Sequence, residues 1–293
     1  MAKSKQRQVS EIVKCGKDPV YFANKYLKIQ HPTKGLVPFN TYDFQDDCLH
    51  DFAGHRFNII LKSRQLGIST LSAAYAVWLA AFYKDKNVLV IATKLAVAMN
   101  FIKKVKVAIK SMPNWLLLPE ITASNKQTVE FSNGSQIKAV PTSDDAGRSE
   151  ALSLLIVDEA AFVRNFDELW MGLYPTLSTG GRAIILSTPN GVGGQYHDLW
   201  LKAQGGENEF NPIKLMWDVH PERGEEWFAR TTANMSKRQI AQEYLCDFAV
   251  SGETYLDDVT LSWIGSLVTK PVMREGPDNN LSLIHISEPT RPY

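Results

Sequence analysis

Short apolar runs, rich in β-branched residues, recur along most of the chain and are separated by longer stretches with helical periodicity. Runs of this kind are typical of strands that are buried on both faces of a sheet. We expect strands at residues 57–61, 87–93, 152–160, 182–191 and 213–217. Buried strands that alternate with helices predict an α/β fold with a mainly parallel central sheet flanked by helices.

The segments between these strands carry helix, turn and loop signals. We expect helices at residues 42–54, capped by Asn40-Thr41, at 96–112, and at 236–248 with Ser236 as its N-terminal cap. Asn133-Gly134 lies between two alternating segments, which predicts a β-hairpin. Residues 31–39 contain two prolines and a glycine and are expected to form a loop.

Residues 57–70, FNIILKSRQLGIST, are the most informative stretch. A buried strand, a tight turn with Gly67 and an apolar helix follow one another, which is the frame of a phosphate-binding loop. The usual string G-x-x-x-x-G-K-[ST] is not matched, because Lys62 replaces its first glycine and Ile68 replaces its lysine. Lys62 and Arg64 keep positive charge in the loop, and either can reach phosphates from the other side. By itself the stretch fits an ordinary strand–turn–helix equally well.

The run LLIVDEA places two carboxylates, Asp158 and Glu159, at the end of a buried strand. Ligands of open α/β sheets bind at that edge. Asp158 can hold Mg²⁺, directly or through water, together with the Ser69 hydroxyl. Glu159 can orient and deprotonate an attacking water. The alternative is an acidic helix N-terminus, but the phosphate-loop frame upstream favours the catalytic interpretation.

The next predicted strand ends in the residues STPNG. Ser187, Thr188 and Asn190 can contact a γ-phosphate and sense its loss, although the same residues also form a plain turn. Arg148 lies in a glycine-flanked polar loop and can stabilise transition-state charge, a role for which Arg64 competes. A surface arginine is the alternative for Arg148.

Composition limits these interpretations without choosing among them. The chain has 293 residues, 44% hydrophobic and 22% charged, with net charge +1, so it neither demands nor excludes nucleic acid. Three widely spaced cysteines indicate reduced thiols rather than a disulfide framework or zinc site. No apolar run approaches the roughly 20 residues that span a bilayer, and the basic N-terminus lacks the apolar region of a secretory signal. The lysines of helix 96–112 most simply form a solvated face, with phosphate contact as the alternative.

Together, SRQLGIST, IVDEA and STPNG resemble the ATPase half of the large terminase subunit of tailed bacteriophages, most closely that of contractile-tailed phages. The resemblance covers roughly residues 20–260 and rests on the order and spacing of the three motifs. It implies a P-loop NTPase of the ASCE type with a small C-terminal lid subdomain. It also implies a Mg²⁺-dependent ATPase motor that drives double-stranded DNA into the prohead.

The resemblance implies roles for individual positions. It assigns the base to Glu159, Mg²⁺ to Ser69 and Asp158, and coupling to the three STPNG residues named above. It makes Arg64 an arginine finger in cis and Arg148 one in trans. It assigns ATP binding to Gln45, which would read the adenine, and to Lys62, Ser63, Arg64, Gln65, Leu66, Gly67, Ile68, Ser69 and Thr70. We expect Lys62 to replace the missing loop lysine, with Arg64 alone as the alternative.

The implied partners are double-stranded DNA, the portal protein, the small terminase subunit and further copies of the chain in a ring, commonly a pentamer. The implied location is the cytoplasm of the infected bacterium and, transiently, the capsid portal vertex, with no membrane contact and no place in the mature virion. A helicase-like DNA translocase and a nucleotide-binding switch without turnover are the alternatives.

The same resemblance suggests how the chain divides. We expect no DNA cleavage, because the carboxylate cluster of the family's nuclease is not found. The expected parts are an N-terminal helical segment (1–50), the ATPase core (51–210), a small subdomain (211–260), a linker toward an absent nuclease domain (261–280) and a non-native tail (281–293).

Overall fold

The computed structural model describes residues 2–31, 33–116, 119–142, 150–251, 263, 274–275 and 281–282. The chain divides into two compact units, Met1–Gly252 and Glu253–Tyr293. In the second unit, β11 (Arg274–Glu275) pairs antiparallel with β12 (Leu281–Ser282). Apart from these two strands and Trp263, the predicted linker and tail lie outside the described residues. All other elements belong to the first unit.

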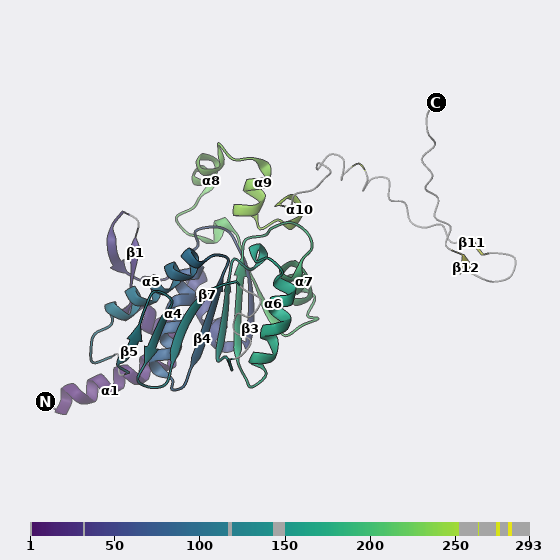
Figure 1. Cartoon of the computed structure of the whole chain (residues 1–293). Helices are drawn as coiled ribbons and strands as arrows, with labels where there is room; N and C mark the ends of the chain where they lie inside the picture. Colours follow the sequence, from purple (N-terminus) through teal and green to yellow (C-terminus); the bar gives the residue numbers. More distant parts are fainter. Residues whose placement is uncertain are drawn as a thin grey trace. The chain divides into compact units, whose positions relative to one another are not determined.

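An eight-stranded sheet forms the centre of the first unit within the described residues (Figure 1). Its strands are β3 (Phe57–Lys62), β4 (Asn87–Ala92), β5 (Ile121–Ser124), β6 (Thr128–Phe131), β7 (Gln136–Pro141), β8 (Leu154–Asp158), β9 (Arg182–Ser187) and β10 (Phe210–Leu215). Their order is β10-β3-β9-β8-β4-β7-β6-β5. The strands from β10 to β7 are parallel, and β6 and β5 continue the sheet antiparallel. The predicted mainly parallel sheet and the β6–β7 hairpin are confirmed.

Strand β9 lies between the strand that leads into the glycine loop and the strand that ends in Asp158. Its register places Ser187 opposite Leu61 on one side and Leu186 opposite Asp158 on the other. The three chain segments of interest therefore leave the sheet at the same edge.

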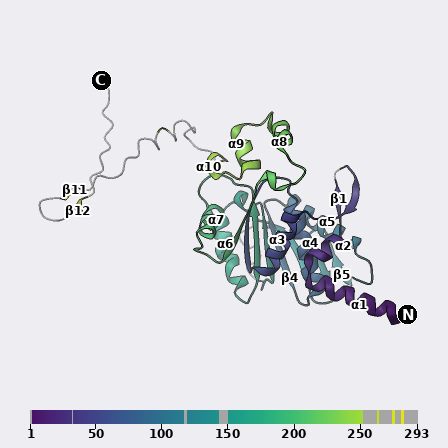
Figure 2. The ribbon, with the colours of Figure 1, turned by 180° about the vertical axis from the view of Figure 1, so that it is seen from behind.

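Two apolar cores cover the two faces of the sheet, because successive strand residues point to opposite faces. Ile60 belongs to one core, and its neighbours Ile59 and Leu61 belong to the other. The first core is covered by α1 (Ala2–Lys17), α2 (Pro19–Tyr26), α3 (Asp43–Gly54), α4 (Ile68–Phe82) and α5 (Leu95–Ser111). The second core is covered by η1 (Ala160–Phe162), α6 (Phe166–Leu173), η2 (Tyr174–Leu177) and α7 (Gln195–Gln204). Figure 2 shows the molecule from the opposite side.

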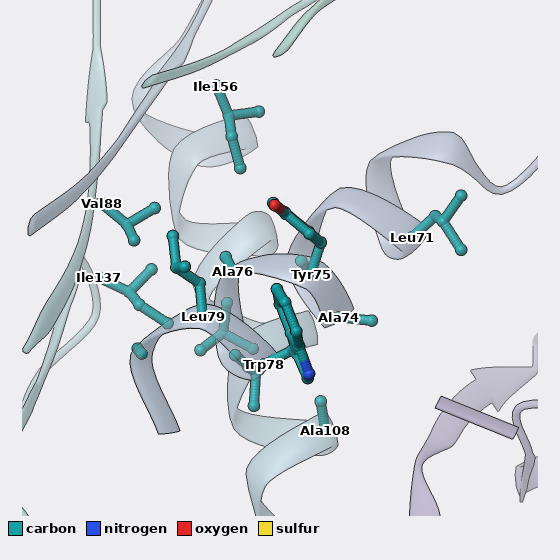
Figure 3. Close-up of a cluster of buried hydrophobic side chains, with 14 of the residues drawn as sticks. Leu71, Ala74, Tyr75, Ala76, Trp78, Leu79, Val88, Ala108, Ile137 and Ile156 are labelled. Carbon is teal, nitrogen blue, oxygen red and sulfur yellow. The ribbon is translucent and has the colours of Figure 1, made fainter. Parts of the chain in front are cut away.

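Helix α4 is buried on nearly all sides, since it packs against the sheet, α5 and the N-terminal helices. Figure 3 shows Tyr75 and Trp78 of this helix among the apolar side chains of its neighbours. Their polar atoms are satisfied: Tyr75 Oη donates to Phe52 O at 2.9 Å, and Trp78 Nε1 donates to Cys15 O at 2.7 Å. This packing fixes the start of α4, where the loop ends.

The predicted loop at residues 31–39 is wrong. β1 (Lys28–His31) pairs antiparallel with β2 (Gly35–Pro38), and Gly35 takes a φ of 71° in the turn between them. Both strands alternate only between exposed and half-buried positions, so they lack the apolar run that reveals a buried strand.

Residues 217–251, which we call the small subdomain, belong to the same compact unit as the sheet. They form η3 (Trp217–Val219), α8 (Glu225–Thr232), α9 (Lys237–Ile240), the π-helical turn η4 (Ala241–Leu245) and α10 (Phe248–Ser251). Figure 1 shows α8, α9 and α10 grouped beyond one end of the sheet. Stacked rings hold it together, with Trp217 and Phe228 at a centroid distance of 4.4 Å. Ser236 caps α9 as predicted, but the predicted helix 236–248 is broken, because Cys246 adopts a left-handed conformation after η4.

None of the helices in the described ranges has both the length and the apolar character needed to cross a membrane. The three cysteines, Cys15, Cys48 and Cys246, are buried free thiols, as predicted.

Candidate nucleotide-binding and catalytic site

The loop between β3 and α4 depends on two residues with positive φ. Gln65 has a φ of 61° and Gly67 a φ of 78°. A Cβ on Gly67 would also lie 2.8 Å from Nε2 of Gln45. The positive φ favours glycine here, and a larger residue would also displace the Gln45 side chain.

The loop presents a row of unengaged amides. Within the described residues, the backbone N–H groups of residues 65–69 have no hydrogen-bond acceptor. Their neighbours are engaged: Ser63 N donates to Leu215 O at 2.7 Å, Arg64 N to Glu243 O at 2.7 Å, and Thr70 N to Gly67 O at 2.9 Å. Consecutive free amides at a helix N-terminus form a cradle for an anion.

Asp158 stands beside this cradle at the end of β8. Its Oδ1 accepts a hydrogen bond from Ser69 Oγ at 3.0 Å. Burial and, next, the charge of Glu159 raise the pKa of Asp158, while Lys62, Lys104 and the Ser69 hydrogen bond act in the opposite direction. The carboxylate form therefore gains from a further positive charge at this place.

Lys62 and Glu159 form an ion pair across the site, with Nζ 3.0 Å from Oε1. Both residues have restricted positions, because Lys62 is buried and Glu159 has a φ of 58° just beyond β8. Oε2 of Glu159 is buried and has no hydrogen-bond partner among the described residues. The predicted base thus has one buried oxygen without a partner among the described residues and one oxygen bound to Lys62.

Arg64 turns toward the small subdomain. Its Nε lies 2.5 Å from Oε2 of Glu243. Arg223 donates to Arg64 O at 3.2 Å and to Gln65 O at 2.7 Å, and its guanidinium stacks over the Trp227 ring at 4.6 Å. Burial raises the pKa of Glu243, and the charge of Arg64 opposes this shift. The small subdomain therefore contacts the loop through the positively charged Arg223 and the negatively charged Glu243.

The predicted coupling residues contact the segment that follows Glu159. Ser187 Oγ accepts from Ala161 N at 3.1 Å, and Asn190 Nδ2 donates to Ala161 O at 3.1 Å. Thr188 Oγ1 is buried and has no hydrogen-bond partner within the described ranges. The turn after β9 is thus linked to the position of the predicted base.

Gln45 lies at the site, but its amide is engaged. Nε2 donates to Leu66 O at 2.8 Å, and Oε1 accepts from Tyr42 N at 3.2 Å. In this conformation Gln45 supports the loop and caps α3, and its predicted contact with adenine stays a prediction. Arg148 lies outside the described residues.

Sequence reasoning missed Arg223, Glu243 and the part that Lys104 plays beside Asp158. None of them belongs to a motif, and Arg223 and Glu243 contact the loop although they are far from it in the sequence. The faint signal for Arg223 was a tryptophan, Trp227, shortly after it in the sequence, since such pairs are often stacked.

The donor set suits Mg²⁺. Ser69 Oγ and Asp158 Oδ1 are oxygen atoms 3.0 Å apart that could serve as ligands, and Oε2 of Glu159 is a further buried oxygen without a partner among the described residues. No group of three or more His, Cys, Asp or Glu side chains with metal-binding geometry occurs among the residues that the structure describes. A site with few protein ligands is typical of Mg²⁺, which keeps water and substrate phosphate oxygens as its other ligands.

Comparison with known sequences identifies relatives. The family described as "Terminase large subunit, T4likevirus-type, N-terminal" matches residues 59–258. The large terminase subunits of Thermus phage G20c and Thermus virus P23-45 are each 28% identical over 168 residues. The match covers 49% of this chain and 33% of each relative, so the chain matches a third of the length of these relatives.

Solved structures show the same fold. The large terminase ATPase domain of Thermus phage P74-26 has a TM-score of 0.62 and 20% identity, with 72% of this chain and 95% of that domain covered. The large terminase of another thermophilic bacteriophage, solved in complex with ATP-gamma-S, has a TM-score of 0.58 and 12% identity, with 72% and 53% covered. That of bacteriophage HK97 has a TM-score of 0.54 and 18% identity, with 77% and 50% covered. Because the family match spans more than half of the chain, this protein belongs to the T4-like-virus type of the terminase large subunit family, and it matches the N-terminal part that carries the ATPase fold.

Proposed function

We propose that this chain hydrolyses ATP and is the motor part of a phage DNA-packaging terminase. The observation that carries the proposal is the hydrogen bond between Ser69 Oγ and Asp158 Oδ1, next to the free backbone amides of residues 65–69. An anion cradle, a hydroxyl and a carboxylate in this arrangement fit the phosphates and Mg²⁺ of a bound nucleotide.

We assign a separate role to each part of the site. The amides of residues 65–69 hold the phosphates. Ser69 and Asp158 would hold Mg²⁺, which would supply positive charge near the phosphates. Glu159 orients the attacking water and accepts its proton.

Lys62 links nucleotide binding to the state of the base. In this conformation its ammonium neutralises Glu159 at 3.0 Å. A phosphate group competes with the carboxylate for the same ammonium, because both are anions. Transfer of Lys62 to the phosphates would satisfy the charge missing at Ile68 and free Glu159 to act on water.

The remaining roles follow from the family membership. The large terminase of the thermophilic bacteriophage compared above has been solved with ADP and with ATP-gamma-S, which supports a nucleotide as ligand. We extend the proposal to double-stranded DNA, the portal protein and the small terminase subunit as partners, and to a ring of copies on the prohead in the infected cell. Ser187, Thr188 and Asn190 would couple hydrolysis to movement, Gln45 would read adenine, and Arg64 and Arg148 would act as arginine fingers in cis and in trans.

The test combines ATP turnover with DNA substrates. Purified chain should release phosphate from ATP in the presence of Mg²⁺, should be stimulated by blunt double-stranded DNA, and should leave a forked duplex paired. ATP binding without any phosphate release would favour a nucleotide-binding switch. Separation of the forked strands would favour a helicase-like translocase.

A further inference from the structure

The position that usually carries the loop lysine is occupied by Ile68, which has no charged group. Ile68 is 1% exposed and belongs to the apolar core under α4. The two cations of the loop are already paired, Lys62 with Glu159 at 3.0 Å and Arg64 with Glu243 at 2.5 Å. A triphosphate would have to compete for both of them.

The lysines of α5 are not equivalent. Lys103 and Lys110 are exposed, and Lys106 Nζ donates to Asn125 O at 2.7 Å at the side of the helix. Lys104 is half-buried. It lies one turn before Ala108, which packs in the core, so the two residues lie on the same side of α5. Helix α5 packs against α4.

A cavity of about 500 Å³ is lined by α5, by two residues of α4 and by β1 with its flanking residues. Lys104 and Thr70, the last residue of the loop motif, both line it. In the part of the chain that the structure describes, the Lys104 ammonium has no carboxylate within ion-pair distance and no hydrogen-bond acceptor. Lys104 is thus a half-buried cation that lacks a protein partner among these residues.

The charges that act on Lys104 are those of the site. Burial lowers its pKa, Asp158 and Glu159 raise it, and Lys62 lowers it. The same interaction affects Asp158, because Lys62 and Lys104 both act to lower the pKa of its carboxyl group. Lys104 therefore lies within electrostatic range of the groups that we assign to Mg²⁺ and to the base.

We propose that Lys104 is a phosphate-binding residue that adds, from α5, a second positive charge to the one that Lys62 brings to the phosphates. The ligand class is a nucleoside di- or triphosphate, and the inference rests on the proposed ATP site. Partial burial of an ammonium without a partner is unfavourable, and an incoming polyphosphate offsets that cost by charge-assisted hydrogen bonds. The loop amides then hold the phosphates from one side and Lys104 from the other.

The test measures dissociation constants for ATP, ADP and AMP, each with Mg²⁺, by isothermal titration calorimetry. Lys104→Met should weaken ATP binding about tenfold or more, ADP binding less and AMP binding least, since the effect follows the number of phosphates. Lys104→Arg should keep most of the affinity. Lys126→Met, an exposed lysine that does not line this cavity, is the control and should bind ATP like the wild type.

Thermal unfolding without nucleotide separates binding from structure. Lys104→Met should unfold at the same temperature as the wild type or higher, because it removes a half-buried charge, and ATP should raise its midpoint less. ATP affinity of Lys104→Met equal to that of the wild type would overturn the inference, and so would loss of the folded state in both Lys104→Met and Lys104→Gln. Failure of the wild type to bind any nucleotide would overturn the proposed function itself.

Discussion

The ammonium of Lys62 lies 3.0 Å from Oε1 of Glu159, so the cation at the head of the loop is bound to the carboxylate beyond β8. The two residues come from neighbouring motifs that β9 separates in the sheet. The pair explains how a buried lysine and a partly buried carboxylate coexist near a site suited to anions, since each offsets the charge of the other.

Lys62→Ala is expected to abolish ATP hydrolysis and to leave the fold intact. The loss should be at least about a hundredfold in turnover, because the variant removes a preorganised charge from the phosphates. Steady-state phosphate release measures it, with the circular dichroism spectrum as the test of folding. Lys84→Ala, an exposed lysine beyond α4, is the control. Near-normal turnover in Lys62→Ala would contradict the account and leave Arg64 as the acting cation of the loop.

Arg223→Ala should loosen the loop. The variant loses two charged hydrogen bonds to Arg64 O and Gln65 O and the stacking contact on Trp227, so the free energy of unfolding should fall by about 1 kcal/mol. ATP affinity should fall with it, because Gln65 is no longer held at positive φ. Urea unfolding and nucleotide titration measure the two effects. Arg230→Ala, exposed on α8, is the control. Equal ATP binding by both variants would show that Arg223 does not position the loop.

Asp158→Asn should stabilise the nucleotide-free chain while it removes activity. Burial and the charge of Glu159 disfavour the carboxylate form of Asp158, so a neutral amide of the same shape relieves that cost. The thermal midpoint near neutral pH should rise by a few degrees, and Mg²⁺-dependent ATP hydrolysis should be lost. Asp167→Asn, exposed on α6, should change neither. A lower midpoint for Asp158→Asn would show that its main role is to hold Ser69 in place.

Glu11 should make stability depend on pH at the acid end. Hydrogen bonds from Lys25, Tyr26 and Tyr21 lower the pKa of Glu11 to about 2. A lowered carboxyl pKa contributes stability above the unfolded value of about 4.5, and this contribution disappears as the pH falls toward about 2. The wild type should therefore unfold at a higher temperature than Glu11→Gln at pH 6, and the difference should vanish near pH 2. A difference that persists at pH 2 would contradict this.

Much of the fold could be predicted because its information is local. The strands that end in Lys62, Asp158 and Ser187 are continuous apolar runs, and the residues that follow them carry the chemistry. Parallel strands bring such ends to one edge, so the meeting of Ser69 with Asp158 follows from the motif order.

The rest depends on contacts that no local pattern reveals. Arg223 reaches the loop carbonyls across more than a hundred residues of chain, and Glu243 meets Arg64 from a π-helical turn. Lys104 looks like its neighbours in the sequence, and only the packing of α5 on α4 separates it from the exposed lysines. The β1–β2 hairpin was missed because neither strand has a buried face.

The most direct test of catalysis by this site compares ATP binding with ATP turnover in Glu159→Gln. This variant should bind ATP at least as tightly as the wild type, because the phosphate-binding groups and Lys62 are left in place. Its turnover should fall at least about a hundredfold, since the base that accepts the proton of water is gone. Glu168→Gln, exposed on α6, should keep both properties. Wild-type turnover in Glu159→Gln would contradict the assignment of the base and, with it, the catalytic site described above.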